Sequence, residues 1–244
     1  MKSCIFLSAL LLLSNLLTAQ SYVDNVEGRH FGYLNLNFQV GVPVDEFSDN
    51  LNSVGIGGGG HVVFRLGKTL PFYAGIDLAG MSYDRESQKY NINVGGFTER
   101  YTLRTSNSIF LGHGMLRFSP DLGAPVKPYI DGMIGTKNLY TRTRLIDDDS
   151  FDEEDYNSEV ERGDWALSYG LALGLRLQVF RKSPEITIDL RCAYLPGANA
   201  TYLARRQNDS GPYDLPIDAF EEKSSTTNLL IPSIGITFNM FKEE

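Results

Sequence analysis

The sequence predicts an all-β protein in which eight antiparallel strands form an up-and-down transmembrane β-barrel over residues 20–244. Three observations support this prediction. Apolar residues recur with a period of two from residue 31 onward, long polar connections alternate with short turns, and an apolar segment stands at the N-terminus. Apolar residues make up 42% of the chain, which excludes a disordered protein, and the net charge of −8 argues against non-specific binding of nucleic acid.

The chain begins with a predicted signal peptide, residues 1–19. Lys2 supplies a positive charge, residues 5–17 form an apolar run, and Ala19 marks a small-residue cleavage site. The apolar run is shorter than the about 20 residues that a membrane-spanning helix needs. Cleavage would leave Cys192 as the only cysteine, so we expect no intrachain disulfide.

The clearest alternation runs from residue 165 to residue 180. A helix would spread the apolar residues of this segment around its whole surface, whereas a strand places them on one side. We therefore predict a strand with one face of small and polar residues and one apolar face. The apolar face consists of Trp165, Leu167, Tyr169, Leu171, Leu173, Leu175, Leu177 and Val179.

Seven further segments alternate in the same way and are predicted strands. Each can be long enough to cross a bilayer at a tilt, which takes about 9–11 residues. They cover residues 33–40, 56–66, 72–78, 107–118, 130–137, 185–194 and 230–240. The strand at residues 165–180 is the sixth of the eight in chain order.

The polar faces of these strands carry charges of both signs. Because the interior of an eight-stranded barrel is just wide enough for its own side chains, we expect these charges to pair and to fill the lumen. The charged residues are Arg65, Asp77, Arg117, Asp131, Arg176, Asp189 and Arg191. Aromatic residues at strand ends suit an interfacial girdle, namely Phe31, Trp165, Phe180 and Phe238.

The connections alternate strictly in length. Short turns are expected at residues 67–69, 120–128 and 181–184, and long polar loops at residues 41–54, 84–105, 141–164 and 196–227. Membrane barrels have short periplasmic turns and long outer loops, so both chain ends are expected on the periplasmic side.

Within the second long connection, Gly95 and Gly96 predict a two-residue type I′ hairpin, because both central positions of that turn need positive φ. We therefore expect the third and fourth strands to continue outward as a ribbon. Its exposed edge would suit strand addition by a protein partner. The alternative is a hairpin that packs over the barrel mouth and binds nothing.

The last strand indicates a family resemblance. Ser233, Gly235, Phe238 and Met240 follow the spacing of a β-signal, a polar residue and a glycine followed by apolar or aromatic residues near the terminus. With this signal and its eight strands, the chain resembles the small eight-stranded outer-membrane barrels of Gram-negative bacteria, the group of OmpX and the OmpA transmembrane domain. The resemblance covers residues 20–244 and implies recognition of the last strand by the barrel-assembly machinery. Met240 departs from the usual terminal aromatic residue.

A soluble lipocalin is the rival fold, because it also has eight alternating strands but turns the apolar faces inward. Lumen charges of both signs and the girdle favour the membrane barrel. The chain also has neither the Gly-x-Trp near the start nor the amphipathic C-terminal helix that lipocalins share.

No catalytic, cofactor-binding or metal-binding residue is predicted. Acyl transfer of the kind found in some small outer-membrane barrels needs a His beside a Ser near the membrane surface. His30 precedes the first strand, His61 and His113 fall in mid-strand on the polar face, and no His follows. No nucleophile elbow, phosphate loop or Cys/His cluster occurs either.

An acidic run at residues 147–155 is the one strong charge cluster. Four residues fall at calcium-loop positions, but Glu153 stands where such a loop needs Gly, so we expect a solvated acidic loop. A divalent cation bridging this loop to lipopolysaccharide is the alternative. The four residues are Asp148, Ser150, Asp152 and Glu159.

The function expected from these features is a structural or surface-interaction role through long extracellular loops of an outer-membrane barrel. The alternatives are a narrow conduit for a small solute and a lipid-modifying barrel enzyme. Expected partners are outer-membrane lipids and lipopolysaccharide, the barrel-assembly machinery, and a surface protein, with no nucleic acid and no cofactor.

Overall fold

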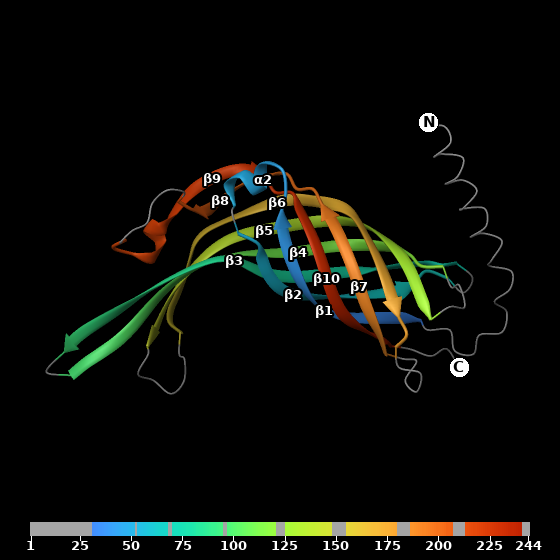
Figure 1. The fold of residues 1–244 in the computed structure, drawn as a ribbon, viewed down its shortest axis with the longest axis horizontal. Coiled ribbons are helices and arrows are strands. Elements are labelled where there is room, and N and C mark those ends of the chain that lie inside the picture. The colour runs from blue at the N-terminus through green and yellow to red at the C-terminus, as the bar shows by residue number, and fades with distance from the viewer. Residues whose placement is uncertain are drawn as a thin grey trace.

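The computed structural model describes residues 31–240 except residues 52, 68–69, 95–96, 121–124, 148–154, 180–185 and 207–212. The predicted signal peptide therefore lies outside the described residues. Eight antiparallel strands close into a barrel, in which β1 pairs with β10 and the chain order runs around the ring (Figure 1). They are β1 (Gly32–Pro43), β2 (Gly55–Arg65), β3 (Phe72–Val94), β4 (Phe97–Phe118), β5 (Val126–Asp147), β6 (Asp155–Leu177), β7 (Ile186–Leu195) and β10 (Leu229–Asn239). The predicted fold class is confirmed.

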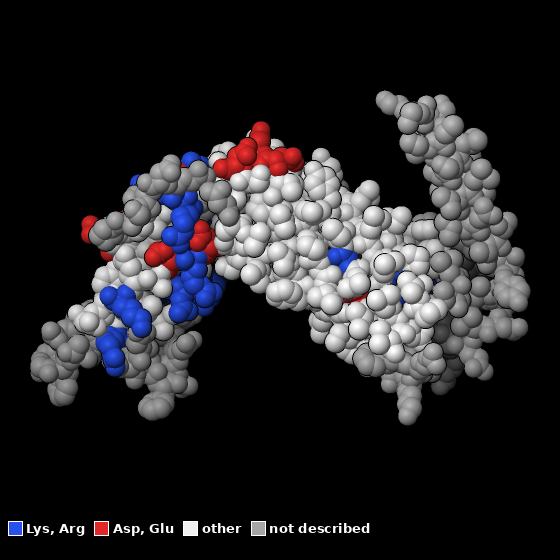
Figure 2. All heavy atoms as spheres, in the orientation of Figure 1, with Lys and Arg blue, Asp and Glu red and all other residues white. Residues whose placement is uncertain are grey.

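The predicted facing of the strands is confirmed as well. On β6, Leu171 and Leu173 are each 62% exposed, whereas Ala172 between them is 1% exposed. A soluble barrel would bury these leucines, so the exposed apolar faces exclude the lipocalin alternative. In Figure 2 the wall of the barrel is almost free of charged side chains.

Aromatic side chains border this apolar wall. At the end with the short connections, the rings of Phe72 and Phe118 lie 5.3 Å apart and those of Phe31 and Phe64 lie 6.0 Å apart. At the other end Trp165 is 61% exposed. These positions fit the two interfacial girdles of a membrane barrel, and the short connections mark their end as the periplasmic one. Phe180 of the predicted girdle lies outside the described residues.

Glycines bring β2 close to its neighbour β3. A Cβ atom on Gly57 would collide with the backbone of Gly80, and one on Gly59 would meet the side chain of Ala79. The glycine run at residues 57–60 therefore serves close packing of the barrel wall.

Four strands extend beyond the barrel wall on the outer side. β3 and β4 stay paired up to Val94 and Phe97, which confirms the predicted ribbon, although the turn itself lies outside the described residues. β5 and β6 were expected to end near residue 140 and to begin near residue 165. Instead they continue to Asp147 and from Asp155, so much of the predicted loop at 141–164 is strand. The result is a projecting sheet formed by β3–β6 (Figure 1).

The predicted loop at residues 196–227 is also partly structured. It contains the strands β8 (Asn199–Arg205) and β9 (Phe220–Thr226), which pair as a separate two-stranded sheet, and the short 3₁₀ helix η2 (Pro216–Ala219). The first long connection contains the short helix α2 (Glu46–Asn50). No helix in the described part of the chain is long and apolar enough to cross a membrane.

Candidate functional site

The middle of the lumen holds a buried network of opposite charges. Arg117 on β4 donates hydrogen bonds of 2.7 and 3.0 Å to the two oxygens of Asp131 on β5. Arg191 on β7 lies 3.3 Å from Asp131 and 3.5 Å from Asp77. Arg117 also donates to Nε2 of His61 over 3.0 Å, and that nitrogen must be unprotonated because a guanidinium has only donors. The predicted pairing of lumen charges is confirmed here.

Polar side chains extend this network toward the periplasmic end. Tyr129 donates a hydrogen bond of 2.6 Å to Asp189, and Thr237 donates to the other oxygen of Asp189 over 3.3 Å. Asn35 in turn donates to Thr237 over 2.9 Å. The side chains of β1, β5, β7 and β10 are therefore joined across the lumen.

Below them Arg176 closes the periplasmic end. Its guanidinium stacks 4.0 Å from the ring centroid of Tyr33 and donates to Ser119 over 2.8 Å. Arg65 departs from the predicted set, because its Nε donates to the carbonyl of Leu70 at the barrel rim and joins no described ion pair in the lumen. It is a rim residue.

Toward the outer side, Lys137 and His113 fill the lumen. Lys137 on β5 is fully buried and donates to the carbonyl oxygens of Leu195, at 2.7 Å, and Thr227. His113 on β4 lies 2.9 Å from the hydroxyl of Ser168. A lumen that admitted water beside Lys137 or Arg117 would leave them exposed, and both are 0% exposed.

The hairpin of β8 and β9 covers the outer mouth of the barrel. Tyr83 on β3 and Asn107 on β4 both donate to the carbonyl of Leu203 on β8 over 3.0 Å. The ring of Tyr202 packs edge-on against Phe47 of α2, with centroids 5.1 Å apart. Burial raises the pKa of the Tyr202 phenol above its usual value. This cap lies over the mouth, whereas the β3–β4 ribbon projects past it.

The same hairpin is tied to the inner face of the projecting sheet. Arg205 at the end of β8 lies 3.2 Å from Asp84 and 2.7 Å from Glu86, both on β3. Partial burial opposes the charge of Arg205, but its hydrogen bonds to these carboxylates raise its pKa above the usual value. Gln88 donates to the carbonyl of Tyr213 over 2.6 Å, so the contact continues outward along β3.

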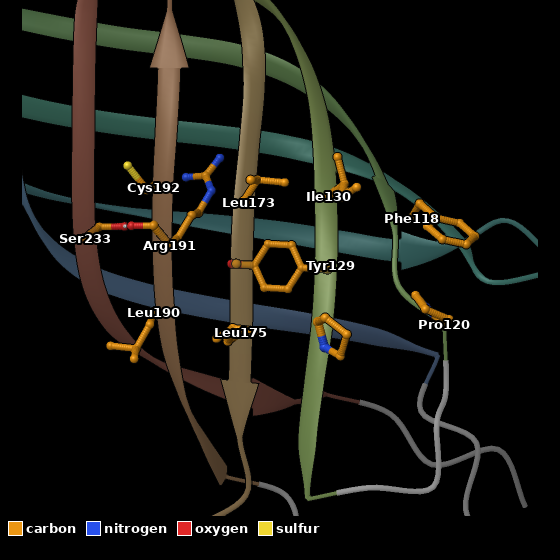
Figure 3. A pocket seen from close by; sticks show the side chains of 12 residues that line it. Phe118, Pro120, Tyr129, Ile130, Leu173, Leu175, Leu190, Arg191, Cys192 and Ser233 are labelled. Carbon is orange, nitrogen blue, oxygen red and sulfur yellow. Dashed lines mark hydrogen bonds between the residues drawn. The ribbon is translucent and has the colours of Figure 1, made fainter. Parts of the chain in front are cut away.

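A hollow of about 580 Å³ lies on the barrel wall between β5, β6 and β7 near the periplasmic end (Figure 3). Apolar residues of the lipid-facing side line most of it, including Ile130, Leu173 and Cys192. The thiol of Cys192 is exposed and unpaired. A hollow of this composition, open toward the bilayer, fits the hydrocarbon chains that surround any membrane barrel.

Gly174 beside this hollow faces Tyr129 in the lumen. Gly174 and Tyr129 are cross-strand partners on β6 and β5, and a Cβ atom on Gly174 would collide with the Tyr129 ring. The alternation pattern alone suggests that a small polar residue would be tolerated at Gly174. The packing contradicts that expectation, because the ring of Tyr129 occupies the space in which such a side chain would stand.

The structure places two of the three histidines in the lumen, as predicted, and His30 lies outside the described residues. The His113–Ser168 pair is the one arrangement that resembles a base and a nucleophile, but Ser168 is 0% exposed and Nδ1 of His113 has no orienting partner among the described residues. Residues 148–154 of the acidic run are also outside the described part. Within that part, no group of three His, Cys, Asp or Glu side chains could hold a metal ion.

Two residues that join the lumen network stand outside the set of charges predicted from the sequence to fill the lumen. Lys137 and Tyr129 both stand on the inward-facing positions of β5, so alternation alone reveals their direction. Their partners lie on β7 and beyond β9, about 60 to 90 residues away in the chain. No local pattern could have identified these partners.

Comparison with known proteins gives similarities of structure only. No family model matches the chain, and no curated protein matches it. Neisserial surface protein A is 11% identical, with a TM-score of 0.35, over 86% of this chain and 96% of that one. Ail, the attachment invasion locus protein of Yersinia pestis, is 12% identical, with a TM-score of 0.39, over 87% and 100%. A major outer membrane protein from Thermus thermophilus is 14% identical, with a TM-score of 0.35, over 85% and 99%.

The register of the strands, together with their facing, decides the class of this protein independently of these similarities. A closed barrel with an apolar outer wall, aromatic borders and a charged interior is the architecture of the bacterial outer membrane. The chain is an integral outer-membrane β-barrel. Its projecting sheet and the capped mouth then lie on the outer side of the membrane, opposite the short turns.

Proposed function

We propose that this barrel has a surface-interaction role and that the projecting sheet is the part that binds. One observation supports the proposal above all others. β2 pairs with β3 only up to Ser82, so beyond that residue β3 has no described strand on its outer edge. On its other edge β3 stays paired with β4 as far as Val94. A long strand with one open edge thus stands outside the membrane.

An open edge presents unpaired N–H and C=O groups that can pair with another chain. Soluble proteins usually cover or shorten such edges, because they promote aggregation. Here Arg205 holds β3 through the side chains of Asp84 and Glu86 and also donates to the backbone carbonyl of Arg85, so the edge proposed for a partner begins beyond that residue. A partner with an extended segment could add a strand along residues 86–94.

The proposed role is not enzymatic. The only described pair of a histidine with a hydroxyl nucleophile is enclosed in the lumen, and acyl transfer to a lipid needs such a pair at the membrane surface. A conduit for a small solute is the second candidate from the sequence. The packed side chains of Arg117 and Lys137 and the cap of β8 and β9 oppose it. A planar-bilayer recording is expected to give no steady conductance, and discrete open levels would favour the conduit.

Two further partners belong to the proposal. The barrel-assembly machinery would recognise β10 through Ser233, Gly235 and Phe238, of which Phe238 faces lipid and is 37% exposed. Outer-membrane lipids and lipopolysaccharide would surround the apolar wall.

Crosslinking from the open edge tests the surface-interaction role. A photoreactive residue replaces Ser87, which is exposed on β3, in cells that display the barrel. Illumination should give a discrete protein adduct. The same residue at Leu173, on the lipid-facing wall, should give no such adduct.

A shortened variant supplies the second arm. Lys89 and Thr102 are cross-strand partners, so residues 90–101 can be replaced by an Asn-Gly turn without changing the register below. This variant should still fold, and the adduct from Ser87 should be lost or much reduced. An adduct that survives the shortening unchanged, or no adduct from Ser87 in the intact protein, would contradict the proposal.

A further inference from the structure

The outer face of the projecting sheet carries a set of basic side chains, here called the basic face. Direct cross-strand partners point to the same side of a sheet, and alternate residues along a strand do so too. On β4, this face continues the lipid-facing positions of Phe110 and Leu116, which are exposed. The basic face consists of Arg85 and Lys89 on β3, Arg100 and Arg104 on β4, and Arg142 and Arg144 on β5.

Charge is separated between the two faces of this sheet. On the inner face, Asp84 and Glu86 of β3 pair with Arg205 of the hairpin. On the outer face of β3–β5, the described positions between these basic residues hold uncharged side chains such as Ser87, Thr102 and Ser106. Figure 2 shows Lys and Arg on the projecting part of the molecule, with Asp and Glu beside some of them, beyond the nearly uncharged wall.

Two arginines of the basic face have a side-chain donor without a described acceptor. The Nε atoms of Arg104 and Arg142 are buried from solvent and have no hydrogen-bond acceptor. No described acidic side chain lies within salt-bridge distance of Arg85, Arg104 or Arg142. These donors need an external acceptor.

Within the basic face, Arg85 and Arg142 form the row that lies nearest the membrane surface. Arg142 stacks 5.5 Å from the ring centroid of Tyr140, and Asn138, the next outward-facing residue on β5, is the partner of the girdle residue Trp165. The step of four residues from Asn138 to Arg142 covers roughly 14 Å along the strand, or about 10 Å along the membrane normal at the usual strand tilt. Headgroups occupy about the first 5–8 Å outside the hydrocarbon core, which the length of an arginine side chain reaches. Arg85 stands in the same row, because both it and Arg142 pair with Ser106.

We propose that the basic face binds the phosphate groups of anionic lipids in the outer leaflet. Arginine forks match phosphate oxygens in charge and geometry, and the membrane-proximal row is continuous with the wall that contacts the acyl chains. This continuity favours a lipid over a soluble polyanion, which would need no alignment with the girdle. The inference depends on the outer-membrane location and not on the open edge of β3.

Titration of the folded protein in zwitterionic detergent with diphosphorylated lipid A tests this site. Trp165 is the only tryptophan in the chain and stands at the adjacent girdle, so its fluorescence reports binding. We expect a saturable change with lipid A, and none with lipid A from which the phosphates have been removed. The dephosphorylated lipid separates headgroup binding from occupation of the apolar hollow by acyl chains. Equal responses to the two lipids would overturn the proposal.

Charge-matched variants identify the residues. The triple variant Arg85→Gln, Arg104→Gln and Arg142→Gln should bind lipid A at least about tenfold more weakly, because three charge-assisted contacts are lost. The control variant Arg162→Gln, Arg206→Gln and Lys223→Gln removes the same charge from the hairpin and the inner face, and its affinity should stay unchanged. An equal loss of affinity for lipid A in both variants would show that binding depends on net charge alone, and it would overturn the proposed site.

Soluble anions and the salt dependence of binding supply two further tests of the proposed lipid site. Inorganic phosphate and heparin test soluble anions, and binding of either by the basic face as tightly as lipid A would overturn the preference for lipid. If the triple variant does not fold, the salt dependence of the unchanged protein replaces it. Lipid A binding should weaken steeply between low and high ionic strength, and an affinity insensitive to salt would contradict a phosphate site.

Discussion

Arg117 and Asp131 face each other across β4 and β5 at the centre of the lumen, joined by two hydrogen bonds and fully shielded from solvent. They are direct cross-strand partners, so the barrel register itself brings the two charges together. Around them, Arg191 and His61 complete a network that spans the barrel from β2 to β7. A shift in the register of β4 and β5 would therefore also break the ion pair that fills the centre of the lumen.

Removing one member of this pair should be strongly destabilising. Asp131→Asn leaves the buried charges of Arg117 and Arg191 short of a carboxylate, and breaking a buried pair in this way costs about 3–5 kcal/mol. Urea unfolding in phospholipid vesicles measures the free energy of unfolding. As a control, Lys223→Gln breaks an exposed pair with Glu221 and should change the stability little. Equal stability of the two variants would mean that the lumen is hydrated.

Substitution of Gly174 should be destabilising through Tyr129. Gly174→Ser places a side chain where the Tyr129 ring lies, and the ring cannot move without losing its hydrogen bond to Asp189. The shift between unboiled and boiled samples on a denaturing gel, measured against temperature, reports the loss. Gly132→Ala, whose Cβ has only one neighbour at 3.9 Å, should keep the unchanged midpoint.

A double substitution tests the stated cause. Adding Tyr129→Ala to Gly174→Ser should remove the steric conflict, so the combined loss of stability should be smaller than the sum of the two single losses. Strict additivity would show that the Tyr129 ring does not cause the effect.

A charge on the lipid-facing wall should oppose insertion. Leu173 is 62% exposed in the middle of the apolar face of β6, and an arginine at mid-bilayer costs about 2–4 kcal/mol. Leu173→Arg should therefore lower the yield of folded barrel in vesicles, as measured by the gel shift. Leu173→Met keeps the surface apolar and should fold normally. A folded yield for the arginine variant equal to that of the methionine variant would contradict the assigned facing of β6.

The terminal strand should matter more for assembly in cells than for stability. Phe238→Ala removes an aromatic residue of the β-signal and of the periplasmic girdle, so we expect slower appearance of the heat-modifiable form in pulse-chase labelling. Leu230→Ala, on the same strand and the same face, lies toward the other end and serves as the control. If both variants assemble at the same rate, Phe238 does not act as a recognition residue.

The predicted strands inside the membrane correspond well to the observed ones for a physical reason. Where one face meets lipid and the other a charged lumen, each residue's polarity reports its direction, as in the run from Trp165 to Leu177 on β6. Outside the membrane this constraint ends. The outer parts of β5 and β6 are polar on both faces, as at Arg142 and Thr143, so the sequence shows no alternation and the segment was predicted to be a loop.

The sequence by itself therefore determined the class of the barrel, the facing of its strands and the outward continuation of the third and fourth strands as a ribbon, because alternation and turn chemistry act between near neighbours. Only the tertiary structure decided which lumen charges pair, that β8 and β9 cap the mouth, and that six basic side chains gather on one face. Those arrangements join residues far apart in the chain. They depend on the register with which the strands pair around the ring, and a local pattern does not contain that register.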